Sequence, residues 1–235
     1  MIIPGSIFAQ RGARGGPPPV AKVAAPIDIT GYWVSVVTED WRYRMLTPKK
    51  SDYPSIPLNP AGRQVADAWD PAKDEAAGNQ CKAFGAANVI RMPGRLHITW
   101  VDDNTLRLDT EAGTQTRLFH FGPAPASPES PWQGVSTAQW QFAGGRRGGV
   151  GGGELKVVTT KMKSGYLQKN GVPYSENAVL TEYFDITKEP NGDELMIVVA
   201  VVEDPQYLNA RFVRSTHFKK IADGSEWKPN PCSAR

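Results

Sequence analysis

The sequence has few of the residues and motifs on which most enzyme and membrane-protein classes depend. Its 235 residues include only two cysteines and three histidines, too few for a multi-cysteine metal cluster. No apolar run approaches the roughly 20 residues that a transmembrane helix needs. The chain also lacks a Gly-x-Ser-x-Gly nucleophile motif, a phosphate-binding loop and a dinucleotide-binding glycine pattern. No catalytic signature therefore assigns the function, and we expect no cofactor.

An excess of charge of one sign is also missing. The net charge of +3 comes from Arg11, Arg14 and Lys22, and the rest of the chain is balanced between basic and acidic side chains. A nucleic-acid-binding domain gathers basic charge on one face, and a membrane-surface protein carries a polybasic face. We therefore expect neither nucleic acid nor a membrane surface as a partner, and the oligomeric state is left open.

The N-terminal segment suggests export. Residues 1–10 are largely apolar, and Ala9 is followed by a Gly/Pro-rich stretch, which is typical of the end of a secretory signal peptide. We expect residues 1–27 to be a residual signal or leader with a flexible linker. Residues 28–235 are then one domain of a periplasmic or extracellular protein. The alternative is an unstructured leader with a few apolar residues.

The two cysteines, Cys81 and Cys232, fit the same interpretation. Exported proteins form disulfides readily, so we predict a bond between them. It would close a long loop and add ~3–4 kcal/mol to stability. Two unpaired buried thiols are the alternative.

Alternating apolar and polar residues predict a series of β-strands. The alternation is clearest at residues 95–100, and Asp102-Asp103-Asn104 then supplies a turn. Further strands are expected at residues 31–38, 106–109, 115–121, 136–142, 154–162, 178–186, 195–203 and 210–220. The segment from Leu195 to Val202 is apolar on both faces, which predicts that something covers the outer wall there.

Two segments interrupt this pattern and are interpreted as insertions, residues 47–80 and 122–153. Both are rich in proline, which is excluded from central strands. In residues 47–80, Asn59 can cap a helix and Pro60 suits the first helical position. A helix is therefore expected from Asn59 to about Trp69. A second short helix is expected from Pro71 to Gly78.

These elements predict an all-β fold with minor α content. Eight to ten antiparallel strands in sequential order favour an up-and-down barrel, because closure removes exposed strand edges. An eight-stranded barrel can hold one small ligand. A closed β-sandwich is the structural alternative.

Two short segments resemble the lipocalin (calycin) signature. Gly31-Tyr32-Trp33 supplies Gly-x-Trp on the first strand, and Arg214 lies on the last strand. In that family the tryptophan closes one end of the barrel and the arginine packs across it. The resemblance implies a lipocalin-like barrel in which Trp33 and Arg214 meet.

A wider resemblance covers roughly residues 80–220. Four motifs are similar to those of a group of uncharacterised exported bacterial proteins, and the resemblance implies export but no particular activity. The motif residues are Trp132, Gly134 and Ser136, then Trp140, then Pro173, Ser175 and Glu182, and lastly Glu203, Asp204, Pro205 and Tyr207.

The densest cluster of charged and aromatic residues is the segment 39–44, with the sequence EDWRYR. If it is a strand, Asp40, Arg42 and Arg44 share one face. Arginines that point into a barrel need carboxylate partners, or they could bind an anionic or carbonyl-bearing ligand through forked hydrogen bonds. The alternative is a solvated edge strand with cross-strand ion pairs.

Candidate site residues follow from these patterns. The predicted ligand-binding residues are Trp41, Arg42, Tyr43, Arg44, Trp100, Arg117, Tyr183, Tyr207 and Arg214. The predicted acid–base residues are Glu182, His97, His120 and Asp40, because a carboxylate or imidazole inside an apolar barrel acquires a shifted pKa. Three histidines on three strands could form a metal site, but we expect no metal because isolated histidines in a β protein are more often structural.

Three functions remain open on the sequence alone. The first is an exported barrel that binds a small, largely apolar or aromatic molecule, gripped by tryptophans and oriented by Arg42, Arg44 or Arg117. The second is a cofactor-free lyase, isomerase or cyclase that uses a Glu or His acid/base with Arg or Tyr charge stabilisation. The third is a structural or assembly protein of the cell envelope.

Overall fold

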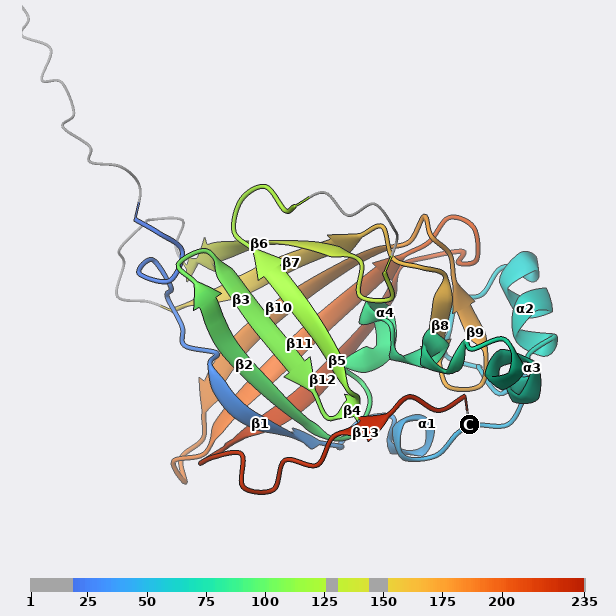
Figure 1. The fold of residues 1–235 in the computed structure, drawn as a ribbon, viewed down its shortest axis with the longest axis horizontal. Coiled ribbons are helices and arrows are strands. Elements are labelled where there is room, and N and C mark those ends of the chain that lie inside the picture. The colour runs from blue at the N-terminus through green and yellow to red at the C-terminus, as the bar shows by residue number, and fades with distance from the viewer. Residues whose placement is uncertain (1–18, 126–130, 144–151, 235) are drawn as a thin grey trace, which may run out of the picture.

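A closed β-barrel forms the body of the structure, a computed structural model that describes residues 19–125, 131–143 and 152–234 (Figure 1). Within these residues nine strands close the barrel in the order β1-β12-β11-β10-β7-β6-β5-β3-β2. Their bounds are β1 (Gly31–Val36), β2 (Arg95–Asp102), β3 (Thr105–Thr110), β5 (Gln115–His120), β6 (Val135–Phe142), β7 (Gly153–Thr160), β10 (Val179–Lys188), β11 (Glu194–Glu203) and β12 (Phe212–Ile221). The expected residues 1–10 of a signal peptide and the glycine-rich part of 144–151 lie outside the described residues.

The predicted β-barrel is confirmed, with one difference in the direction of a strand. All neighbouring strands pair antiparallel except β5 and β6, which pair parallel through Phe119 with Ser136 and His120 with Thr137. A parallel pair needs a long crossover connection, and the proline-rich segment after β5 provides the length. The barrel is therefore mixed rather than uniformly up-and-down.

Short helices cover one end of the barrel, which we call the helical end (Figure 1, right). The elements there are α1 (Trp41–Met45), α2 (Pro60–Asp67), α3 (Pro71–Ala76), the 3-10 helix η1 (Gln80–Phe84), α4 (Ala86–Val89) and the hairpin of β8 (Gly165–Gln168) and β9 (Val172–Tyr174). The predicted cap of α2 is confirmed, since the Asn59 side chain accepts a hydrogen bond from the Gly62 amide at 2.8 Å. The helix predicted from Pro71 is confirmed as α3, whereas η1, α4, β8 and β9 were not predicted.

Residues Trp41–Met45 form the helix α1, so the interpretation of this segment as a strand is wrong. Asp40 adopts the left-handed conformation (φ 49°) directly before α1, and this turns the chain away from the direction of β1. Aspartate tolerates that conformation better than most residues. The alternation of charged and aromatic residues therefore does not sort Asp40, Arg42 and Arg44 onto one face.

The opposite end of the barrel is crossed by residues 19–30, which we call the strap and which had been expected to be mostly linker. The Lys22 amide donates to the Asp103 carbonyl at 3.0 Å, and the Trp140 indole donates to the Ala21 carbonyl at 2.8 Å. Ile27 and Ile29 pack on the apolar core below. The strap is thus held by the β2–β3 turn and by β6.

Two large apolar clusters fill the barrel interior, and a third, smaller one around Phe84 and Met92 lies at the helical end. Of the two large clusters, one lies toward the strap and includes Trp33, Ile98 and Phe184, and the other lies toward the helical end and includes Leu180 and Tyr174. Strand β10 runs through both, because Leu180 belongs to one cluster and Phe184 to the other.

The outer wall at β11 is less covered than its sequence predicts. Met196, Val198 and Val202 face inward and are buried, whereas Ile197 and Val199 on the other face are half-buried. The neighbouring side chains of β10 and β12 shield them partly, and the expected covering element is not seen in the described residues.

The residue pair implied by the lipocalin resemblance is not formed. Trp33 is fully buried, but the cation over its ring is Lys220, with Nζ 5.4 Å from the ring centroid. Arg214 lies six residues earlier on β12, paired in register with Ala200 of β11, and approaches the Phe212 ring instead. The barrel is compatible with a lipocalin-like fold, but Arg214 lies toward the end of the barrel opposite to Trp33.

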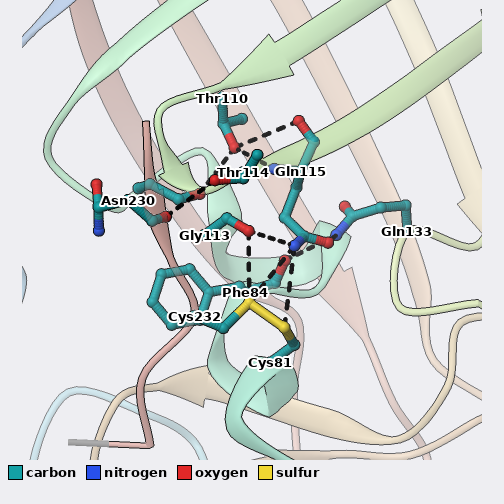
Figure 2. The surroundings of a disulfide bond; sticks show 10 residues. Cys81, Phe84, Thr110, Gly113, Thr114, Gln115, Gln133, Asn230 and Cys232 are labelled. Atoms are coloured by element: carbon teal, nitrogen blue, oxygen red, sulfur yellow. Dashed lines mark hydrogen bonds between the residues drawn. A yellow bond between two sulfur atoms is a disulfide. The ribbon is translucent and has the colours of Figure 1, made fainter. Parts of the chain in front are cut away.

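The predicted disulfide between Cys81 and Cys232 is present (Figure 2), with Cα atoms 5.0 Å apart. It joins η1 to the C-terminal segment, where β13 (Asn230–Pro231) pairs parallel with β4 (Ala112–Gly113). Gln115 donates to the Gly113 carbonyl at 2.6 Å beside the sulfur atoms. The bond therefore anchors the C-terminal segment to the helical end of the barrel.

In the described residues, no helix has the length and apolar character needed to cross a bilayer.

Candidate functional site

A pocket lies at the helical end of the barrel, where three arginines come together. Arg44 comes from α1, Arg91 from the turn after α4, and Arg214 from β12. They are 3%, 7% and 8% exposed, so each is more than nine-tenths buried. Buried charge is costly unless it is compensated, which makes their contacts the central question for this pocket.

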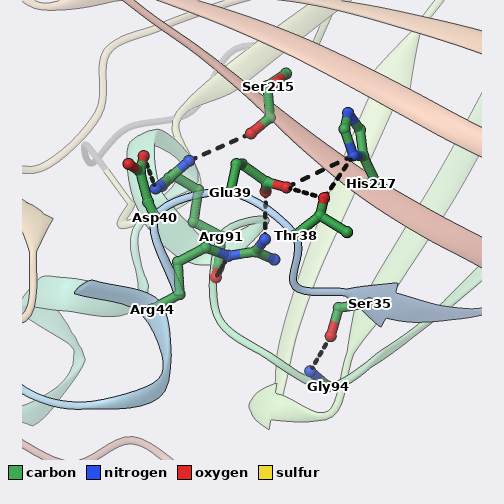
Figure 3. A network of polar contacts seen from close by, with 9 residues as sticks. All are labelled: Ser35, Thr38, Glu39, Asp40, Arg44, Arg91, Gly94, Ser215 and His217. Atoms are coloured by element: carbon green, nitrogen blue, oxygen red, sulfur yellow. Dashed lines mark hydrogen bonds and ion pairs between the residues drawn. The ribbon is translucent and has the colours of Figure 1, made fainter. Parts of the chain in front are cut away.

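Arg44 and Arg91 are held by carboxylates and by backbone carbonyls (Figure 3). Arg44 forms an ion pair with Glu39, and its Nε donates to the Arg91 carbonyl at 3.0 Å. Arg91 pairs with Asp40 at 2.7 Å and donates to the Ser215 carbonyl at 3.3 Å. The two guanidinium groups thus sit side by side over the same end of β12.

Among the residues that the structure describes, no carboxylate forms a hydrogen bond with Arg214. Its Nη1 donates to the Leu167 carbonyl at 3.0 Å, and its Nη2 donates to the Ala87 carbonyl. Arg214 Nε and Arg44 Nη2 are both buried and have no hydrogen-bond partner among the described residues. Two charged donors at this pocket therefore lack an acceptor.

The pocket carries an excess of positive charge. The three arginines and Lys169 line it or face it, against the carboxylates of Glu39 and Asp40. Burial lowers the pKa of Arg214 well below its usual value, and the neighbouring Arg91 lowers it further. Burial also lowers the pKa values of Arg44 and Lys169. An anion in the pocket would relieve this repulsion.

The pocket has a narrow inner part and a wide outer part. The inner part has a volume of about 30 Å³, which accommodates a group of only a few atoms. It continues into a depression of about 550 Å³ that shares Asp40, Ser55, Phe212 and Arg214 with it. Apolar groups from Ile56, Met92, Leu167 and Phe212 line the walls. The shape suits a small polar head group with an apolar body.

Glu39 links this pocket to His217 on the outer face of β12 (Figure 3). One carboxylate oxygen pairs with Arg44, and the other accepts from the Thr38 hydroxyl at 2.8 Å. The same hydroxyl lies 3.1 Å from His217 Nδ1, which is itself 3.5 Å from the carboxylate. Glu39 therefore stands between a cation of the pocket and a titratable group near the surface.

A second ionic cluster lies deeper in the barrel. Arg117 of β5 and Glu182 of β10 form a two-pronged ion pair, at 2.9 Å and 2.5 Å, and both side chains are fully buried. Arg117 also donates to Thr159 at 3.2 Å, and Thr159 is 2.7 Å from the Ser136 hydroxyl. This pair occupies the level between the two apolar clusters and leaves Glu182 without solvent contact.

The structure divides the predicted residues of segment 39–44. Asp40, Tyr43 and Arg44 line the inner pocket. Trp41 is 62% exposed, and Arg42 points away and pairs with Asp52. Only part of the predicted cluster therefore contributes to the pocket.

The predicted tryptophan lies at the other end of the barrel. Trp100 forms an aromatic cluster with Phe121 and Trp140, with ring centroids 5.2 to 6.5 Å apart, beneath the strap. The expected combination of Trp100 with Arg44 in one pocket is not formed, because Trp100 lies near the end of β2 beneath the strap, whereas Arg44 lies on α1 at the helical end.

The remaining predicted residues lie outside the pocket. His97 stacks on Tyr32 on the outer wall, with ring centroids 3.9 Å apart, and His120 lies 3.5 Å from Thr105. Tyr183 faces outward near Lys156, and the Tyr207 carbonyl accepts from Asn59 beside α2. In the described residues, no group of three or more His, Cys, Asp or Glu side chains is arranged to hold a metal ion.

Sequence reasoning missed Arg91 and Lys169. Arg91 follows a short helix that was not predicted, and Lys169 lies in the turn between β8 and β9. Neither residue belongs to a motif, so no local signal marks them.

Comparison with protein-family models, curated proteins and solved structures found no match.

Proposed function

We infer that this protein is an exported β-barrel that binds a small molecule with one anionic group and an apolar or aromatic body. The observation that carries the proposal is the pair of buried, unpartnered donors, Arg44 Nη2 and Arg214 Nε, at a pocket with excess positive charge. Arginine donors favour carboxylate, sulfonate or phosphate oxygens, which accept charge-assisted hydrogen bonds. The inner part of the pocket receives the anionic group, and the outer depression receives the body.

Export is supported by the disulfide between Cys81 and Cys232. Disulfides persist in the periplasm and outside the cell, and they are rare where thiols are kept reduced. Binding in such a compartment would follow diffusion of the ligand to the exposed outer depression.

An acid–base enzyme is less well supported. That function needs an accessible carboxylate or imidazole that is free to exchange a proton, whereas Glu182 is fully buried and bound to Arg117. Asp40 reaches the pocket, but its carboxylate is paired with Arg91 at 2.7 Å. His97 and His120 lie away from the arginine pocket. The envelope-assembly alternative depends on Gly/Pro-rich arms that lie largely outside the described residues.

The test compares two arginines on the same short helix. Benzoate, benzenesulfonate and neutral benzyl alcohol are titrated against the full chain by NMR or calorimetry. Arg44→Gln is expected to weaken binding of the two anions roughly tenfold to hundredfold, as loss of a charge-assisted hydrogen bond predicts. Arg42→Gln is the matched control, because Arg42 pairs with Asp52 outside the pocket, and its affinities should equal those of the wild type.

Thermal unfolding shows whether Arg44→Gln remains folded. Lys169→Gln, at a half-buried position in the pocket lining, provides a milder second variant and should weaken anion binding by a smaller factor. Equal binding of benzyl alcohol and the two anions, or equal losses from Arg42→Gln and Arg44→Gln, would show that the proposal is wrong. Native mass spectrometry of protein purified from its own host then identifies any retained ligand.

A further inference from the structure

The arginine pocket already contains an anion that belongs to the protein itself. Glu39 Oε1 pairs with Arg44 Nη1, whereas Nη2 of the same guanidinium has no hydrogen-bond partner among the described residues. A ligand anion on Nη2 and the Glu39 carboxylate on Nη1 would therefore share one positive charge and repel each other, so they compete for one guanidinium. The loop that carries Glu39 lies between β1 and α1, so the carboxylate can move without breaking a strand pairing.

The second oxygen of Glu39 has a different set of partners. Thr38 donates to Oε2 at 2.8 Å and lies 3.1 Å from His217 Nδ1. Because one hydroxyl hydrogen serves only one acceptor, a Thr38 bond to Glu39 requires a hydrogen on Nδ1 of His217. A protonated imidazole always carries that hydrogen, and it adds a positive charge 3.5 Å from the carboxylate.

We propose that Glu39 is an internal competitor for the anion site and that protonation of His217 draws it away from Arg44, so that the ligand binds more tightly at mildly acidic pH. This inference rests on the proposed function. It assigns Glu39 and His217 as positioning residues that regulate the site rather than contact the ligand.

The surroundings of His217 favour Glu39 as the group that responds. On the same face of β12 the nearest charge is Lys219, which is held by Asp193 at 2.7 Å. The residues in register on the neighbouring strands are Val36 of β1 and Ile197 of β11, both uncharged. Beyond Glu39 lie Arg44 and Arg91, the latter already paired with Asp40. An imidazole gains its proton between pH 8 and 5 in ordinary surroundings.

The experiment uses benzenesulfonate, whose charge is constant between pH 8.0 and 5.5. For the wild type we expect its affinity to rise at least about fivefold as the pH falls through this range, a coupling at the lower end of the usual allosteric scale. Glu39→Gln should bind as tightly at pH 8.0 as the wild type does at pH 5.5, with little change with pH. His217→Gln should remain in the weaker binding state at both pH values.

His97→Gln is the matched control, since His97 stacks on Tyr32 on the outer wall and should leave the pH dependence unchanged. An independent readout without any ligand is the NMR signal of the Arg44 side chain, which should differ between pH 8.0 and pH 5.5 in the wild type and stay constant in Glu39→Gln.

The outcomes separate this inference from the proposed function. If benzenesulfonate binds with the same affinity at both pH values, and Glu39→Gln binds no better at pH 8.0, the competitor role is wrong while the anion site stands. If benzenesulfonate binds neither the wild type nor Glu39→Gln at either pH value, the anion site is wrong and the regulation falls with it.

Discussion

At the scale of single residues, Arg117 and Glu182 form a fully buried ion pair in the middle of the apolar barrel interior. Two hydrogen bonds join them, and Arg117 Nη2 also donates to Thr159, while Arg117 Nε has no partner among the described residues. Such a pair contributes little net stability compared with apolar side chains, but breaking it is costly because one charge is left buried. The pair therefore fixes how β5 and β10 face each other across the barrel.

We predict that Glu182→Gln destabilises the protein by about 3–5 kcal/mol, because it leaves the Arg117 charge without a counter-charge. The double variant Arg117→Met/Glu182→Leu should recover most of that loss. Chemical denaturation measures both. The control is Glu203→Gln, which breaks the exposed pair with Arg211 and should cost less than about 1 kcal/mol. A cost for Glu182→Gln no larger than the control would show that the barrel interior admits water to Arg117.

Among the elements, the turn before β6 brings the chain against the end of β7. Gly134 has a φ of +60°, and a Cβ there would lie 2.5 Å from the Thr160 carbonyl oxygen and 2.7 Å from Met162. The chain therefore needs glycine for both its conformation and its close approach to β7. This approach leads directly into the antiparallel pairing of β6 with β7, which begins at Val135 and Thr160.

We predict that Gly134→Ala costs about 2–5 kcal/mol, the sum of the left-handed conformation and the steric overlap. Gly192→Ala is the matched control, since Gly192 also has a positive φ (+89°) but no atom within 4 Å of its added Cβ. It should cost only about 1–2 kcal/mol. Urea denaturation measures the difference, and equal costs for the two variants would contradict the close approach.

In the molecule as a whole, the two ends of the barrel are covered by different means. The strap crosses one end, and the helices with the β8–β9 hairpin cover the other. The disulfide between Cys81 and Cys232 joins the helical end to the last residues of the chain across a separation of 151 residues. It thereby restricts the unfolded chain far more than it restricts the barrel.

We predict that replacing both cysteines with serine lowers the free energy of unfolding by about 3–5 kcal/mol, because the closed loop is long. The circular dichroism of the strands should be unchanged, since no barrel strand contains either cysteine. The control is a reducing agent, which should lower the melting temperature of the wild type to that of the variant. A reducing agent without effect on the wild type would contradict the disulfide's contribution.

The sequence alone predicted the nine barrel strands, the barrel class, the cap of α2 and the disulfide, but not the β8–β9 hairpin or the parallel pairing of β5 with β6. The strands and the helix cap depend on short-range patterns, such as the alternation at residues 95–100 and the Asn59-Pro60 pair. For the disulfide, a chain with two cysteines allows only one intramolecular pairing. The sequence did not predict that three arginines share the pocket. Arg44 and Arg214 are predicted site residues, but Arg44 is predicted on the face of a strand and Arg214 in contact with Trp33, and the structure forms neither arrangement.

Only the tertiary structure decided which of these residues meet. Arg44, Arg91 and Arg214 come from three segments far apart in the chain, and contacts between these segments bury them: Arg44 bonds the Arg91 carbonyl, Arg91 the Ser215 carbonyl and Arg214 the Ala87 carbonyl. Trp100 and Arg44 are separated because Trp100 packs with Phe121 and Trp140 beneath the strap, whereas α1 carries Arg44 at the helical end. Local sequence patterns predict where strands and helices form. Which distant charged residues meet in one pocket depends on how the closed barrel and its helices pack, and no local pattern predicts that packing.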